Sequence, residues 1–201
     1  MACRSGGKLR HARLLLIPLA AWLAGCTPTT AGLRYPLLSP IEDASRYGYE
    51  QHLVERDRYQ ILFTAPLVAV APLPEARAED QRRLARIAFD LACWRAAELA
   101  QLHRMAGVRI LDAGTRIDML SDTFVDPYWD LFYARAGMSR YHGDGEPGFA
   151  GPATGSPILR ARAAVTAQLV PQLGPGDLDA AALLGALRAR YPAADRPPPP
   201  F

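Results

Sequence analysis

Cysteine is scarce in this sequence. Three of the 201 residues are cysteine, namely Cys3, Cys26 and Cys93. A disulfide framework needs paired cysteines, and a cysteine-based zinc site needs several of them at close spacing. Three cysteines this far apart in the sequence therefore exclude a disulfide framework and a cysteine-based zinc site.

Motifs that carry known chemistry are also missing. Beyond the first 25 residues the histidines are His52, His103 and His142, and none has a partner at His-Glu-x-x-His or comparable spacing. The sequence has no Gly-x-Ser-x-Gly elbow, no phosphate-cradling loop and no dinucleotide fingerprint. We therefore expect no catalytic residue, no metal site and no cofactor.

The apolar run at residues 14–23 is too short to span a bilayer, which needs about 20 residues. Small residues Ala24 and Gly25 follow this run. Four basic residues precede it, namely Arg4, Lys8, Arg10 and Arg13. Basic, apolar and small segments in this order are typical of a secretory signal peptide over residues 1–25.

The tetrad Leu23-Ala24-Gly25-Cys26 closes this segment and resembles the lipobox of bacterial lipoproteins. The resemblance implies cleavage between Gly25 and Cys26, followed by acylation of the Cys26 thiol and amine. One acyl chain binds a membrane only marginally, whereas several anchor a protein stably, at about 0.8 kcal/mol per buried CH₂. Thr27, which stands where aspartate favours inner-membrane retention, indicates the outer membrane. The alternative is an ordinary signal peptide that contains a cysteine, or a short buried helix.

Net positive charge belongs largely to the expected signal peptide. The whole chain has 23 Lys+Arg residues against 20 Asp+Glu residues. Four of the basic residues lie in residues 1–25, which leaves 19 against 20. Nucleic-acid binding requires a clustered basic surface, so we do not expect a nucleic-acid partner.

Proline and glycine suggest the limits of the mature chain's parts. Residues 26–45 contain three prolines without an apolar period and are predicted to form a flexible tether. Residues 46–191 are predicted to form a single α/β domain with a glycine- and proline-rich loop at 143–157. The proline-rich tail at 192–201 is either a polyproline ligand or a frayed terminus.

Several stretches have the patterns of regular elements. Residues 59–64 are rich in β-formers and predict a strand, and residues 108–112 predict a second strand that returns beside it. Apolar residues at every odd position of 159–169 favour a long strand, with a helix as the alternative. Residues 74–106 predict a long helix, with Gly107 in the left-handed position after its end. Asp177 is expected to cap a last helix at about 178–191.

These elements predict an α+β fold. We expect a two-layer α/β sandwich, in which one long helix and a C-terminal helix pack on one face of a small, mostly antiparallel sheet. Between the predicted strands at 108–112 and 159–169, Asp126 could cap a short helix that ends near Gly137, although an ordered aromatic loop fits the same residues.

Arg95 and Glu98 fall inside the apolar stripe of the long helix on a helical wheel. At a spacing of three residues they can pair, and a buried charge persists only when it is paired and hydrogen-bonded. We expect a structural ion pair that fixes the helix against residues near 47–50, with a polar functional site as the alternative. Arg95→Ala should then lower stability by roughly 3 kcal/mol or more.

An aromatic cluster is the best candidate for a binding surface. It comprises Tyr128, Trp129, Phe132 and Tyr133. Aromatic side chains dominate interaction hot spots, but the pattern favours the alternative, in which the same residues pack into the core across the open end of the sheet. Cys93, by contrast, is expected on the polar side of the long helix without a histidine near it, which favours an incidental thiol over a nucleophile.

Three stretches resemble an uncharacterised family of proteobacterial lipoproteins. They are Tyr-Gly-Tyr-Glu at 47–50, Tyr-Gln-Ile-Leu-Phe at 59–63 and Arg-Ala-Ala-Glu-Leu at 95–99. The family shares a Gly-Tyr-x-Glu lead, a strand that starts with tyrosine, an Arg-Ala-Ala-Glu-Leu helix and a glycine-rich middle. The chain departs from this pattern at 63–66, where it has Phe-Thr-Ala-Pro. The resemblance implies a lipoprotein and this fold, without a reaction.

The sequence thus predicts a non-enzymatic lipoprotein of the cell envelope, anchored in the outer membrane and facing the periplasm. Membrane lipid would hold it through acylated Cys26, and its domain would serve a structural role or bind an envelope protein. The alternative is an envelope enzyme or a small-ligand-binding lipoprotein whose site forms only in the fold.

Overall fold

The computed structural model describes residues 35–41, 46–120, 126–138 and 156–197. The expected signal peptide, the lipobox with Cys26 and most of the expected tether lie outside these ranges. The same is true of His142, of most of the glycine-rich loop and of the last four residues.

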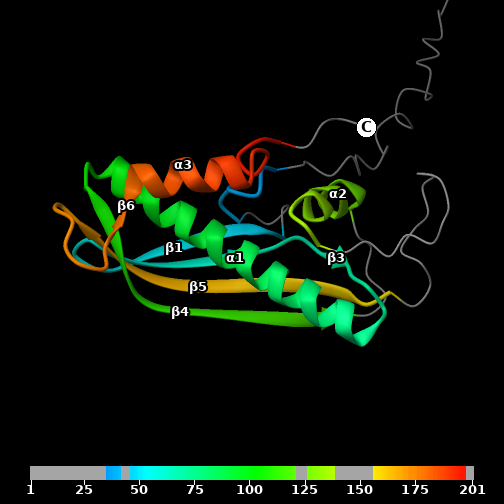
Figure 1. Ribbon diagram of the computed structural model, residues 1–201. Coiled ribbons are helices and arrows are strands. Elements are labelled where there is room, and N and C mark those ends of the chain that lie inside the picture. Colours follow the sequence, from blue (N-terminus) through cyan, green and yellow to red (C-terminus); the bar gives the residue numbers. More distant parts are fainter. Residues whose placement is uncertain (1–34, 42–45, 121–125, 139–155, 198–201) are drawn as a thin grey trace, which may run out of the picture. The chain divides into compact units, whose positions relative to one another are not determined.

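Six strands form an antiparallel sheet with the order β1-β2-β5-β4-β6, and β3 pairs with β5 next to the end of β2 (Figure 1). The strands are β1 (Gly48–Glu55), β2 (Arg58–Thr64), β3 (Val68–Ala69), β4 (Gly107–Leu120), β5 (Ile158–Val170) and β6 (Leu178–Asp179).

Three helices accompany the sheet, and they are α1 (Pro74–Leu102), α2 (Pro127–Arg135) and α3 (Ala180–Arg190). Helix α1 crosses β2, β5 and β4, and α3 packs along α1 on the same side of the sheet (Figure 1). Helix α2 lies against β3. The predicted α+β fold, with helices layered on one face of an antiparallel sheet, is confirmed.

Strand β5 is the centre of the sheet because its alternation suits burial on one face. Its odd-numbered residues are buried toward the helices, including Ala161, Ala163 and Ala167, each at most 2 % exposed. Their small side chains let α1 approach the sheet closely. The other face of β5 carries Arg160, Arg162 and further polar residues, as expected for an antiparallel sheet that is open on one side.

The strand after the long helix was predicted beside 59–64, and this prediction is wrong. Strand β5 lies between β2 and β4 and pairs with both. Strand β4 also continues to Leu120 instead of ending at Asp112. It can carry many polar residues because most of it lies at the exposed edge of the sheet. A bulge between Ile110 and Asp112 keeps it in register with β5.

Helix α1 begins at Pro74 as predicted, but its C-terminal end differs from the prediction. The helix ends at Leu102, and the left-handed residue after it is Arg104, with φ 58°. Gly107 instead begins β4, where a Cβ atom would meet the Leu178 carbonyl and the Leu173 side chain. Glycine is therefore required there by the close approach of β6, and not by a turn.

The cap of α3 is Asp179, which accepts a hydrogen bond from the Ala182 backbone N–H at 2.8 Å. The prediction of Asp177 as the cap is wrong. Asp177 binds Arg109 through two hydrogen bonds of 2.7 and 3.0 Å and accepts a third from the Gly174 N–H. These bonds, with that to Arg109 foremost, hold the pKa of Asp177 below its usual value.

Part of the expected tether belongs to the folded domain. Leu37 is fully buried in the core, and Leu38 N–H donates to the Ala194 carbonyl at 3.3 Å. Pro40 forms a bridge with Tyr49 of β1. Sequence periodicity did not predict this packing because the prolines interrupt any apolar period. A tether could therefore include residues 26–34 but not residues 35–41.

Candidate functional site

Arg95 and Glu98 lie together at the side of α1 that faces β1. Arg95 Nη1 is 2.7 Å from Glu98 Oε2, and Arg95 Nε donates to Gln51 Oε1 at 2.8 Å. The guanidinium also stacks over the Tyr49 ring, 4.4 Å from its centroid. Glu98 accepts a further hydrogen bond from Trp94 Nε1 at 3.1 Å.

This cluster is well suited to a structural role. The Arg95 and Glu98 side chains are 18 % and 27 % exposed, so the pair is shielded from water but not sealed. Both residues have protein partners, and these partners come from β1 and α1 itself. The cluster therefore joins the helix layer to the edge of the sheet, with contacts at Tyr49 and Gln51 where the sequence indicated residues near 47–50.

The aromatic cluster was considered as an exposed interaction surface, and the structure contradicts this. Trp129 is 1 % exposed, Phe132 8 % and Tyr133 0 %, while Tyr128 is half-buried. Trp129 meets the rings of Tyr47, Tyr128 and Phe132 edge-on. Capping of α2 by Asp126, which accepts from the Tyr128 N–H at 2.9 Å, turns these rings into the core.

Cys93 was expected on a polar helix face, and this expectation is wrong. The residue is buried, at 4 % exposure, because α3 covers the side of α1 that the sheet leaves open. Burial, with a smaller contribution from Asp90, raises the pKa of the thiol from 9.0 to about 12. The thiol is therefore protonated at neutral pH and is not an activated nucleophile.

We expect Cys93 in the folded protein to react very slowly with iodoacetamide at pH 8 and rapidly in urea. Because the folded pKa is raised, any stability that the thiol contributes is present below pH 9 and is lost as the pH rises toward 12. Alkylation followed by mass spectrometry measures the rate. Equal rates in the native and unfolded chains would contradict the buried position.

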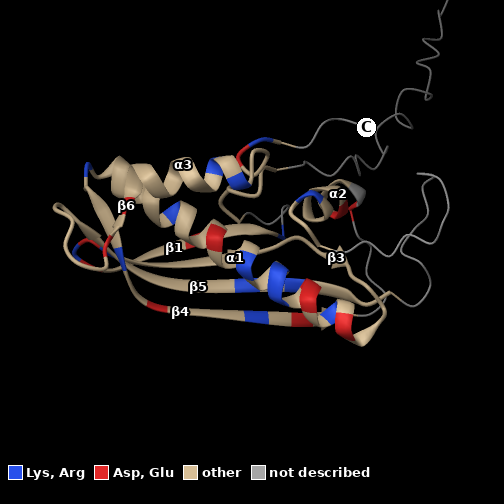
Figure 2. Cartoon of the chain, viewed as in Figure 1, with Lys and Arg blue, Asp and Glu red and all other residues tan. Residues whose placement is uncertain are grey.

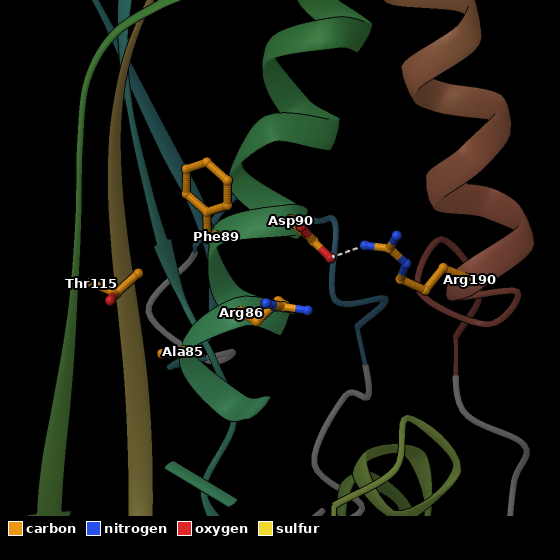
Figure 3. A pocket seen from close by; sticks show the side chains of 6 residues that line it. All are labelled: Ala85, Arg86, Phe89, Asp90, Thr115 and Arg190. Carbon is orange, nitrogen blue, oxygen red and sulfur yellow. Dashed lines mark hydrogen bonds and ion pairs between the residues drawn. The ribbon is translucent and has the colours of Figure 1, made fainter. Parts of the chain in front are cut away.

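A shallow groove lies between α1, α3 and the middle of β4. It is lined by Ala85, Arg86, Phe89, Asp90, Thr115 and Arg190 (Figure 3). Asp90 accepts hydrogen bonds from Arg190 Nη1 at 2.8 Å and from the Tyr191 hydroxyl at 2.7 Å. Arg86 is exposed, and it is the cation of this groove that a bound anion could reach without breaking the Asp90 pair.

A second hollow lies on the open face of the sheet. Gly114, Ala164, Leu62 and Thr64 are among the residues that line it. Two arginines also line it, Arg116 and Arg162, and Asp118 pairs with Arg116 at 2.7 Å and with Arg162 at 3.3 Å. Burial and the neighbouring Arg162 lower the pKa of Arg160.

Thr115 lines both hollows, so the middle of β4 is accessible from both faces. It is also accessible from the side. Strand β6 pairs with Gly107 and Val108 alone, and beyond them no strand of the described chain pairs with the outer edge of β4. No local sequence pattern marks this edge, because the strand that lies at the edge of a sheet is determined by long-range pairing.

Comparisons of the chain with protein-family models, with curated proteins and with solved structures find no match in any of the three. Within the described ranges, no group of three or more histidine, cysteine, aspartate or glutamate side chains is placed to hold a metal ion. None of the described helices is long and apolar enough to cross a membrane.

Proposed function

We propose that this protein is a lipid-anchored component of the outer membrane, and that its domain faces the periplasm as a non-enzymatic structural or protein-interaction module. The observation that carries this proposal is the tetrad Leu23-Ala24-Gly25-Cys26 at the end of a basic and then apolar segment. Acyl chains on Cys26 would hold the protein at the membrane through residues 26–34.

The surface of the domain supports an interaction role. Arg95 and Glu98 are engaged by hydrogen bonds within the protein. The outer edge of β4, in contrast, leaves backbone groups available for a partner. The groove at Arg86 favours a second candidate, the binding of a small anionic ligand, but it is shallow and its other cation, Arg190, is engaged by Asp90.

Replacing Cys26 tests the anchor. We expect Cys26→Ser to abolish palmitate labelling and to move the protein from the membrane fraction to the soluble fraction. Cys93→Ala is the matched control, because it removes the other cysteine of the mature chain and should change neither property. Crosslinking and pull-down from intact cells then compare the partners that each variant retains. Membrane retention and labelling of the Cys26→Ser variant would contradict the proposal.

A further inference from the structure

We propose that the outer edge of β4 is a self-association surface, which pairs antiparallel with β4 of a second copy about a two-fold axis at Ile117. The inference rests on the proposed function in one respect. Copies that are each anchored in the same membrane are concentrated in two dimensions. This concentration favours association through interfaces that are too small to be stable in dilute solution.

The direction of the backbone groups follows from the bonds around β5. Ala65 N–H donates to the Ala161 carbonyl, and Leu169 N–H donates to the Asp57 carbonyl, so the odd residues of β5 bond on the β2 side. The even residues of β5 therefore bond to β4. Past the bulge they face even residues of β4, as in the pair Arg116 and Arg162.

It follows that odd residues of β4 direct their N–H and C=O groups to the free edge. These residues are Ala113, Thr115, Ile117 and Met119. No other strand of the described chain reaches them, and the Met119 side chain is 62 % exposed. An edge that no described strand pairs with is a template for pairing with another strand.

The charges along β4 select the register. Acidic and basic residues alternate along the strand (Figure 2). In a two-fold antiparallel pair, an axis at Thr115 would place Asp112 opposite Asp118. An axis at residue 116 or 118 would place a charged residue opposite its own copy. Like charges directly opposite each other are destabilising.

An axis at Ile117 gives the opposite result. Arg116 of each copy then lies across from Asp118 of the other, so each Asp118, which already pairs with Arg116 and Arg162 of its own chain, gains a further unlike charge on the open face. Thr115 lies across from Met119, which covers the exposed methionine. An axis at Gly114 would also pair unlike charges, Asp112 with Arg116, but its ladder runs into the bulge beside Asp112.

The other edge of the sheet is a poorer surface. The free part of β1 is short, because Tyr49 is already bonded to the chain at Ser39 and Ile41 and a bulge separates Leu53 from Glu55. Pairing at β4 joins two sheets into one, with both helix layers on the same face, as a two-fold axis normal to the sheet requires.

A cysteine placed on the axis tests the pairing in the full chain in its native membrane. We expect Ile117→Cys to give a disulfide-linked dimer with copper phenanthroline, because residues in a hydrogen-bonded antiparallel pair have Cα atoms about 5.5 Å apart, within disulfide range. Leu53→Cys, exposed on the opposite edge, is the matched control and should remain monomeric. The native Cys93 is buried and does not compete.

Charge reversal gives an independent test that does not depend on oxidation. In the Ile117→Cys background, Arg116→Asp alone and Asp118→Arg alone each place like charges opposite one another and should reduce the crosslinked fraction at least fivefold. Combining Arg116→Asp with Asp118→Arg restores unlike pairs and should restore crosslinking. Circular dichroism of each purified variant shows that it is folded.

Four results would overturn the proposal. One is equal crosslinking at Ile117→Cys and Leu53→Cys, another is stronger crosslinking at Gly114→Cys, and a third is adducts with a different protein in place of the dimer. The fourth is absence of crosslinking at Ile117→Cys in a protein that is still palmitate-labelled and membrane-bound, which refutes the pairing and leaves the anchor intact. Loss of labelling refutes the anchor instead.

Discussion

Trp129→Ala is expected to lower the free energy of unfolding by about 3–5 kcal/mol. The indole is 1 % exposed, and the rings of Tyr47, Tyr128 and Phe132 have their centroids 5.1, 4.6 and 6.1 Å from that of Trp129. Removing it would open a cavity at the centre of this cluster and end three edge-on ring contacts. Urea unfolding of the full chain, followed by circular dichroism, measures the loss.

Two variants on the same helix serve as controls. Leu131→Ala truncates a side chain that is 45 % exposed and should change stability by about 0.5 kcal/mol or less. Tyr133→Phe removes a buried hydroxyl without a hydrogen-bond partner among the described residues, so it should leave stability unchanged or raise it by about 1 kcal/mol. A loss below 1 kcal/mol for Trp129→Ala would mean that the cluster is open to solvent after all.

The aromatic cluster also explains why residues 35–41 are not a tether. Tyr47, which contacts Trp129, accepts a hydrogen bond from the Tyr35 N–H at 3.1 Å and donates its hydroxyl proton to the Tyr35 carbonyl at 2.8 Å. Helix α2 thus supports Tyr47, and Tyr47 in turn holds the chain that leads into the domain. The Trp129→Ala substitution is therefore expected to weaken the packing of residues 35–41 as well as that of α2.

Local pattern was sufficient for the main elements. The alternation at 159–169 predicted β5, and the helical period predicted most of α1, because one face of each element packs against the other layer. Strand β1 was missed because most of its residues beyond Tyr49 are polar and exposed. Strand order was missed because β5 enters between β2 and β4 from distant sequence, and no local pattern records that pairing.

The candidate site likewise combines features that local sequence predicts with features that depend on tertiary structure. The positions of Arg95 and Glu98 on one helical face follow from sequence spacing alone, and so the pair could be predicted. The surroundings of Cys93 could not, because a helical wheel assumes one buried face and α1 is covered by both the sheet and α3. The free edge of β4 depends on β6 ending after two residues, which is a tertiary property.

Arg95→Ala is expected to lower the free energy of unfolding by about 2–3 kcal/mol. The change removes the ion pair with Glu98, the hydrogen bond to Gln51 and the contact with the Tyr49 ring. The loss should lie at the lower end of the range for buried pairs, because Glu98 keeps its bond from Trp94 and is 27 % exposed. Urea unfolding again provides the measurement.

Arg82→Ala is the matched control for this prediction, because Arg82 is an exposed arginine on the same helix, and it should change stability by about 0.5 kcal/mol or less. Glu98→Ala and the double variant complete a thermodynamic cycle that isolates the pair from the Gln51 and Tyr49 contacts. An unchanged urea midpoint for Arg95→Ala would refute the structural role. If that variant also lost partner recovery from intact cells while remaining fully folded, the cluster would be a polar functional site instead, because a purely structural pair acts on binding only through stability.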